Sequence, residues 1–477
     1  MRISDYYKLK RTQPNLDFVD VDINRDLPVF IDPHAIRFMD SAWTQECVAN
    51  IQNYFKTVLD AIHDGNKAHA IRLLNVLREP NETHLGLSRG VSQGKALGPI
   101  SSQSVWESLS HSEAVKSGLL EDLEDTILMI YGISSDIVSD ITTNIIRGSL
   151  IKYTQQMADY YEIPLIDGVY PGPIWDSLNK QWLTLLTRLP IAENKKLLLV
   201  PKMIVRRRME YNVDDYYTNY LLDQLRVNEL NANTELVHLL KNGVRRVTSK
   251  DLKAKYGTGK SAIVRLTMEN PEVLARYRND MKAIVNPPLD HSEFSDVEST
   301  ALPDWEELLR NVISIVPGNK EAIAYEKAIE AFFTTIFYPS LTNPIAQVKI
   351  HKGRKRIDIS YTNIASNGFF KWLSMHFPSP NIFIECKNYS GEIGNPELDQ
   401  LSGRFSPSRG TVGILVCRSF DDKNLFLERC RDTAIDQRGY IIVLDDSDLK
   451  ALVVDREKTS GNQDFSLIKN QFDNLIN

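Results

Sequence analysis

The chain of 477 residues (54.4 kDa) is too long for a single ordinary hydrophobic core, so we expect two or three domains. Its composition, with 42% apolar and 25% charged residues, is typical of a globular protein. A formal net charge of -6 and a pI near 5.9 exclude a uniformly basic protein that coats nucleic acid, but they leave room for local basic patches.

Cysteine usage and hydropathy predict a cytoplasmic protein. The four cysteines, Cys47, Cys386, Cys417 and Cys430, have neither the spacing of a zinc site nor that of a disulfide framework. The amino terminus has no apolar signal core, and the most apolar run, at 197–205, is too short and too interrupted to span a bilayer. We therefore expect a reducing compartment and no membrane association.

Helices dominate the first part of the sequence. A polar, glycine-rich stretch at 81–100 predicts a loop, and apolar residues recur at helical spacing over 113–161 and 210–285. The run LLLVPKMIV at 197–205 is the best candidate for a strand in this part. We expect a mostly helical amino-terminal region, 1–285, that can contain two subdomains and serve as a sensor, a partner-docking platform or a DNA-binding region.

Two polar clusters stand out in this region. Asp136, Asp140 and Asn144 lie four residues apart on one face of a predicted helix, which indicates either a metal or partner site or a hydrated helix face. The hydrated face is the simpler interpretation. Glu82 and His84 are also more typical of residues that form local hydrogen bonds than of metal ligands.

Basic residues gather at 242–265, which predicts either a helix-turn-helix-like DNA contact or a solvated surface. Within this segment YGTGKS imitates the end of a phosphate-binding loop. Ala254 replaces the first glycine of that motif, and a charged segment replaces the buried strand that must precede it. We expect no nucleotide binding here, and we expect Gly257 and Gly259 to separate two helices.

The main boundary falls at 286–305, where prolines, serines and acidic residues without apolar periodicity are typical of a linker. Beyond it, in 306–477, the pattern changes to helix, strand, strand, helix, strand, helix and strand. The predicted fold class is therefore α/β: a mainly helical amino-terminal region, followed by a small mixed β-sheet flanked by helices. The expected strands of this sheet are 356–360, 381–387, 411–417 and 440–445.

Charged residues interrupt two of these strands. Residues two apart in a strand point to the same face, so Glu385 and Lys387 are neighbours. An isolated pair of this kind is usually a weak surface ion pair. Asp358, however, lies on the preceding strand, and two carboxylates on adjacent strands can hold Mg²⁺ for phosphodiester hydrolysis. Lys387 can then orient the attacking water and offset negative charge on the phosphate.

The helix before these strands offers one more carboxylate. Glu326 flanks the apolar stripe of the predicted helix, and Glu330 follows one turn later as a substitute. Taken singly, each is an ordinary surface residue of a helix.

The ordered set Tyr325-Glu326, Asp358, Glu385-Cys386-Lys387 and Gln400 resembles the site of the PD-(D/E)xK nuclease superfamily, most closely its Mrr-type restriction endonuclease branch. The resemblance covers about residues 318–452. It implies a restriction-endonuclease-like domain that hydrolyses DNA with Mg²⁺ (or Mn²⁺). By family analogy it also implies defence against foreign (phage) DNA.

The resemblance also implies a role for each matching residue. Asp358 and Glu385 correspond to the metal ligands and Lys387 to the water-orienting cation. Glu326 corresponds to an auxiliary acid, and Gln400 to a residue that shapes the site. The sequence departs from the pattern at Arg404, where related exonucleases carry tyrosine, so the mode of cleavage stays open.

A longer segment than usual separates Asp358 from Glu385. It contains Phe369, Phe370 and Trp372, which predict an inserted helix that packs on the domain or on a partner, with base stacking as an alternative. Just before Asp358 the sequence is strongly basic, which predicts either a solvated hairpin or contacts with the nucleic-acid backbone. The candidate backbone-binding residues are Lys352, Arg354, Lys355 and Arg356.

The expected partners are DNA, a second copy of the chain in a homodimer or higher oligomer, and an ATPase or sensor protein that regulates the nuclease. The alternative function is that of a catalytically silent nucleic-acid-binding or scaffold subunit of a defence or repair complex. A third hypothesis places the activity in the amino-terminal half.

Overall fold

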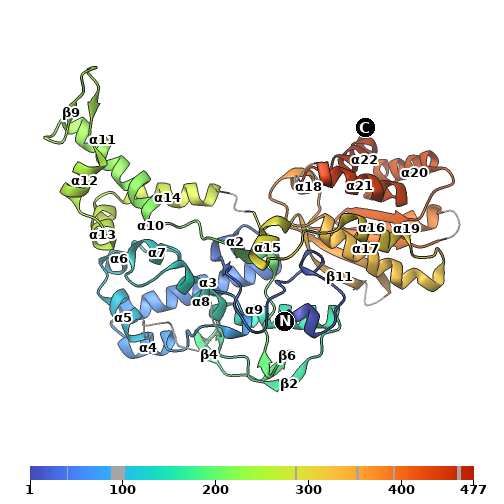
Figure 1. Ribbon diagram of the computed structural model, residues 1–477, viewed down its shortest axis with the longest axis horizontal. Helices are drawn as coiled ribbons and strands as arrows, with labels where there is room; N and C mark the ends of the chain where they lie inside the picture. Colours follow the sequence, from blue (N-terminus) through green and yellow to red (C-terminus); the bar gives the residue numbers. More distant parts are fainter. Residues whose placement is uncertain (40, 87–101, 285–286, 351–353, 390–392, 459–462) are drawn as a thin grey trace.

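The computed structural model describes residues 1–39, 41–86, 102–284, 287–350, 354–389, 393–458 and 463–477. The α/β class is confirmed: a mainly helical amino-terminal region precedes a carboxy-terminal sheet flanked by helices (Figure 1). Within the described ranges, no helix combines the length and hydropathy needed to cross a bilayer. Most of the predicted loop at 81–100 lies outside the described residues.

The long helix α3 is central to the amino-terminal region. It starts at Ser41, whose hydroxyl accepts a hydrogen bond from the backbone N–H of Thr44, and it packs against α2, α4, α8 and α9. The helices of this region are α1 (Ile3–Tyr6), α2 (Pro33–Arg37), α3 (Ala42–His63), α4 (Lys67–Leu74), α5 (Ser102–Ser110), α6 (Glu113–Lys116), α7 (Asp125–Met129), α8 (Ser135–Ile145), α9 (Arg147–Tyr160), α10 (Val213–Asp215), α11 (Leu222–Ala232), α12 (Ser249–Tyr256), α13 (Lys260–Glu269) and α14 (Pro271–Ala283).

The prediction of a strand at 197–205 is wrong. Pro201 has no N–H to donate to a sheet, and Lys202–Ile204 forms a single 3-10 turn. Only Val205 enters a strand, β8 (Val205–Arg206), which pairs with β1 (Phe30–Ile31). The apolar residues of the run are buried, but most of them lie in a loop. The other strands of this region are β2 (Ile166–Val169), β3 (Ile174–Asp176), β4 (Gln181–Leu183), β5 (Thr187–Leu189), β6 (Ile191–Ala192), β7 (Lys195–Lys196), β9 (His238–Leu239) and β10 (Arg245–Arg246).

The predicted linker contains a helix, α15 (His291–Glu298). The Asp290 carboxylate accepts a hydrogen bond from the backbone N–H of Glu293, and the Glu293 carboxylate accepts one from the backbone N–H of Asp290, each at 2.9 Å. Phe294 is buried in the amino-terminal core. This part of the connection is therefore a capped and packed helix.

The carboxy-terminal sheet has the strand order β11-β12-β13-β14-β15. The pairs β11-β12 and β12-β13 are antiparallel, whereas β13-β14 and β14-β15 are parallel, so the sheet is mixed. The strands are β11 (Leu341–Ile350), β12 (Lys355–Asn363), β13 (Asn381–Lys387), β14 (Val412–Cys417) and β15 (Tyr440–Leu444).

Helices cover both faces of this sheet. The Tyr361 hydroxyl donates to the backbone carbonyl of Glu330 on α17 at 3.0 Å, whereas Phe383 stacks on Phe405 after α19. Because Ile382, the partner of Tyr361, is adjacent to Phe383 on β13, α17 and the α19 segment contact opposite faces. The helices are α16 (Trp305–Ile313), α17 (Ala322–Ile336), α18 (Gly368–His376), α19 (Asn395–Ser402), α20 (Lys423–Ile435), α21 (Asp446–Lys458) and α22 (Ser466–Ile476).

The aromatic insertion before β13 forms α18, as expected. Phe369 and Phe370 are buried, and Phe370 lies 5.4 Å from Phe337 and 5.5 Å from Phe465, measured between ring centroids. Trp372 stacks on Phe369. These rings therefore belong to the core of the carboxy-terminal part rather than to a base-stacking surface.

Helix α17 offers a direct test of this core, because it carries one buried and one exposed isoleucine. Ile329 is 0% exposed and Ile323 is 72% exposed. We expect Ile329→Ala to lower the free energy of unfolding by about 2–5 kcal/mol, since it leaves a cavity. Ile323→Ala should change it by no more than about 0.5 kcal/mol. Denaturant unfolding of both variants measures the difference, and equal losses would contradict the assigned packing.

Candidate functional site

The register of β12 and β13 brings the two predicted metal ligands together. Ile359 pairs with Ile384, so the next position along each strand places Asp358 opposite Glu385, on the same face. The regular pairing stops before this position. Instead, the Asp358 carboxylate accepts a hydrogen bond from the backbone N–H of Cys386 at 3.0 Å. The two carboxylates therefore meet where the strands begin to separate.

Glu385 is the most deeply buried member of the site, with 0% of its surface exposed. The Lys387 ammonium lies 2.8 Å from one of its carboxylate oxygens, and the Arg404 guanidinium is paired with the other. Burial raises the pKa of Glu385, and the nearby charge of Asp358 raises it further, against the opposing effect of the two cations. The Glu385 carboxylate is thus held between two cations.

Lys387 and Gln400 are also brought together. The Lys387 ammonium donates to the side-chain oxygen of Gln400 at 3.1 Å, which links the end of β13 to α19. Burial lowers the pKa of Lys387, but the charge of Glu385 and the hydrogen bond to it outweigh burial, so the net shift is upward. Lys387 therefore carries a positive charge at neutral pH.

Glu326 lies on α17, the helix that packs on the face of the sheet opposite to the α19 segment. Its carboxylate accepts a hydrogen bond from the side-chain amide of Gln347 on β11. Burial raises its pKa, and the charge of Asp358 raises it further. Glu330, the substitute considered above, is committed elsewhere, because it forms a buried ion pair with Arg11 of the amino-terminal region.

The sequence patterns did not identify two residues of this group, Arg404 and Gln347. Arg404 was noted only as a departure from a tyrosine, yet it pairs with Glu385. Gln347 carried no signal at all, because glutamines on strands are common. The spacing of Arg404, four residues after Gln400, was the one clue that it shares the helix end that faces the site.

The predicted backbone-binding residues are only partly described. Lys352 lies outside the described residues. Lys355 donates to the backbone carbonyl of Gly403 at 2.7 Å, and Arg354 and Arg356 are exposed at the start of β12. Arg356 lies near enough to Glu326 to lower its pKa. Two exposed guanidinium groups therefore precede Asp358 along the chain.

The donor set fits a magnesium ion. Mg²⁺ is usually held by one or two carboxylates and takes its other ligands from water and phosphate. In the described part of the chain the second oxygen of Asp358 makes no hydrogen bond, which leaves it free to act as a ligand. Within the same part, no group of three or more His, Cys, Asp or Glu side chains is arranged as a metal site.

A groove of about 570 Å³ lies between α17 and the amino-terminal region. Glu326 and Ile359 line it from the carboxy-terminal side, and Lys8 and Lys10 line it from the amino-terminal side. Both lysines are exposed. The amino-terminal segment therefore contributes positive charge next to a predicted site residue.

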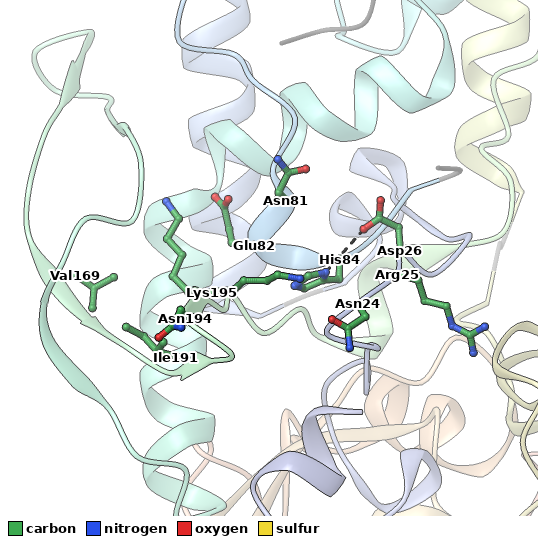
Figure 2. Close-up of a pocket in the computed structure, with 11 residues that line it drawn as sticks. Asn24, Arg25, Asp26, Asn81, Glu82, His84, Val169, Ile191, Asn194 and Lys195 are labelled. Atoms are coloured by element: carbon green, nitrogen blue, oxygen red, sulfur yellow. Dashed lines mark ion pairs between the residues drawn. The ribbon is translucent and has the colours of Figure 1, made fainter. Parts of the chain in front are cut away.

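The structure also contains a polar pocket of about 460 Å³ that the sequence did not predict (Figure 2). His84 is 4% exposed and faces Asp26, with 3.9 Å between Nδ1 and the carboxylate oxygen. Its Nε2 atom has no hydrogen-bond partner among the described residues. Lys196 also lines the pocket, and burial lowers its pKa to about 8. The cavity has the size of a small-molecule site.

The acidic face of α8 carries two half-buried carboxyl groups, those of Asp136 and Asp140. Burial raises the pKa of Asp140 to about 8, and the charges of Asp136, Glu79 and Asp26 add to the shift. Asn144 donates to the backbone carbonyl of Arg78 at 2.7 Å. Asp140 is therefore a half-buried carboxyl group among other acids, and the predicted alternatives, a metal or partner site and a hydrated face, stay open.

The segment YGTGKS, which imitates the end of a phosphate-binding loop, forms the turn between two helices, as expected. Lys260 donates to the backbone carbonyls of Ile130 and Ile133, the latter at 2.9 Å, so its ammonium is committed to the end of α7. Gly257 and Gly259 separate α12 from α13 with φ angles of +82° and +83°.

The family described as a domain of unknown function (DUF8370) matches residues 8–212. Neither a curated protein nor a solved structure matched the chain. The matched segment includes the whole lining of the pocket in Figure 2 and ends well before the carboxylate group around Asp358.

The raised pKa of Asp140 predicts a pH-dependent stability. In the unfolded chain this carboxyl ionises near pH 4, whereas in the fold it does so near pH 8, so its ionisation opposes folding as the pH rises between these values. We expect Asp140→Asn to be more stable than the wild type at pH 8, by on the order of a few kcal/mol, and to match it more closely at pH 5. Thermal unfolding at the two pH values tests this, and an advantage that is equal at both would contradict it.

Proposed function

We propose that the carboxy-terminal part is a Mg²⁺-dependent deoxyribonuclease of the PD-(D/E)xK type. The observation that supports this most strongly is the meeting of Asp358 and Glu385 at the point where two strands separate, with the Lys387 ammonium against Glu385. The order of these residues and the mixed sheet that carries them agree with the resemblance seen in the sequence.

Asp358 and Glu385 are the residues that would hold the metal ion. When bound, Mg²⁺ lowers the pKa of a water molecule and stabilises negative charge on the scissile phosphate. Lys387, which stays protonated, orients the attacking water and offsets charge as it develops. Gln400 accepts a hydrogen bond from the Lys387 ammonium and holds it in place. Glu326 is assigned the part of the auxiliary acid by the resemblance.

Defence against foreign DNA, and regulation by a partner ATPase or sensor, follow from family analogy and remain proposals. A homodimer would suit the cutting of both strands of a DNA duplex.

One observation favours the alternative of a silent nucleic-acid-binding subunit. Arg404 pairs with Glu385 and therefore competes with a metal ion for that carboxylate. A partner or a bound DNA strand that draws Arg404 away would relieve this competition.

We expect purified protein to cleave plasmid DNA in Mg²⁺ or Mn²⁺ and to lose this activity in EDTA. Asp358→Ala and Lys387→Ala should each lower the cleavage rate at least about 100-fold, because each removes a metal ligand or a charge that acts in the transition state. Asp421→Ala, which removes an exposed carboxylate in a loop, is the matched control and should cleave at the wild-type rate. Gel-based single-turnover rates measure all four proteins.

Cleavage that persists in EDTA, or in both site variants, would refute the proposed mechanism. If the wild type binds DNA but does not cleave it with either metal, the silent alternative gains support. Activity from residues 1–285 alone would instead place the chemistry in the amino-terminal region.

A further inference from the structure

A basic arm projects from the amino-terminal region at the opposite end of the molecule from the carboxy-terminal sheet (Figure 1). The arm comprises residues 238–269: the hairpin β9-β10, then α12, a three-residue turn and α13. It contains eight lysines and arginines but only two acidic residues, a local net charge of +6 in a chain whose total is -6. So much positive charge in so short a segment indicates a polyanionic partner.

The arm is anchored in the core of the amino-terminal region. Leu252 on α12 and Ile263 and Leu266 on α13 are buried, and Arg245 is anchored to α11 through the Leu230 carbonyl and the Asn233 side chain. Two helices joined by a short glycine-containing turn are the arrangement of a helix-turn-helix unit. The positive charge is therefore presented by a fixed scaffold.

Five of the eight cations have partners within the protein. Lys255 pairs with Glu229, Arg265 with Glu269, and Lys260 with backbone carbonyls. Arg245 is anchored as described, and the Lys253 ammonium lies 5.9 Å from the centroid of the Tyr217 ring. These residues serve the fold of the arm.

The other three cations, Lys241, Arg246 and Lys250, are exposed. Within the described ranges their side chains form no hydrogen bond or ion pair. Arg246 lies opposite His238 in the hairpin, so the two side chains share a face, and His238 contacts Asp251 on α12 at 3.0 Å. Arg246 therefore lies on the side of the hairpin that meets the start of α12, where Lys250 is located.

We propose that the basic arm binds the phosphate backbone of duplex DNA through Lys241, Arg246 and Lys250, at a distance from the candidate nuclease site. The choice of DNA as the polyanion rests on the proposed function, but the binding itself requires no cleavage. The arm holds the duplex without reading its sequence, since contacts with phosphate carry no base information. A chain with overall negative charge needs such a local contact to approach DNA.

The test is a binding measurement in EDTA, which separates it from any nuclease activity. A fluorescently labelled DNA duplex is titrated with the full chain, and the affinity is recorded by anisotropy at several salt concentrations. The arm variant combines Lys241→Ala, Arg246→Ala and Lys250→Ala. The control variant combines Lys56→Ala, Lys67→Ala and Lys371→Ala, three exposed lysines outside the arm. Both variants change the net charge equally.

We expect the arm variant to bind at least about 10-fold more weakly than the wild type. The slope of log affinity against log salt should fall by about 2–3, because each lost phosphate contact removes about 0.9 from the slope. The control variant should keep the wild-type slope. Thermal unfolding checks that both variants fold.

Equal affinity and slope in the arm and control variants would overturn the proposal, as would the absence of binding by the wild type. Cleavage by Asp358→Ala in Mg²⁺ is measured separately from the binding titration. If this variant cleaves like the wild type while the arm variant alone loses affinity, the nuclease proposal fails and the arm proposal stands.

Discussion

The carboxy-terminal site depends on the burial of one carboxylate, that of Glu385. A buried carboxylate without compensation is too costly to keep ionised, so its neighbours must supply positive charge and hydrogen bonds. Lys387 and Arg404 supply the charge, and the separation of β12 from β13 leaves room for Asp358 beside it. Such a group is tolerated in a core only if it is compensated in this way, which is why it points to chemistry rather than to packing.

The same helix that bears Glu326 also ties the two parts of the molecule together. Glu330 on α17 pairs with Arg11, and Asp17 accepts a hydrogen bond from the backbone N–H of Asn343 on β11 at 2.7 Å. Asp17 itself is buried, and its carboxylate accepts a hydrogen bond from the Tyr153 hydroxyl at 2.7 Å. A movement of the amino-terminal region would thus act directly on α17 and β11, which lie beside the candidate site. This contact is a physical route by which a sensor could control a nuclease.

Two basic areas lie in different parts of the amino-terminal region. The basic arm concentrates positive charge away from the sheet, and the groove with Lys8 and Lys10 brings a smaller amount next to Glu326. The pocket around His84 lies inside the segment that matches the family of unknown function. A duplex held by the arm and a small ligand held in the pocket would act on different parts of one amino-terminal region, whose contacts reach α17.

The sequence by itself determined the fold class and the order of the carboxy-terminal elements, because alternating apolar strands and amphipathic helices leave a local periodic signal. It also placed Glu385 and Lys387 on one face, since that follows from the geometry of a single strand. It misjudged 197–205, where Pro201 and tertiary burial override an apolar run, and it missed the helix at 291–298. Only the tertiary structure decided that Asp358 opposes Glu385, that Arg404 pairs with it, and that Arg11 holds Glu330, because these contacts join residues far apart in the chain and leave no local pattern.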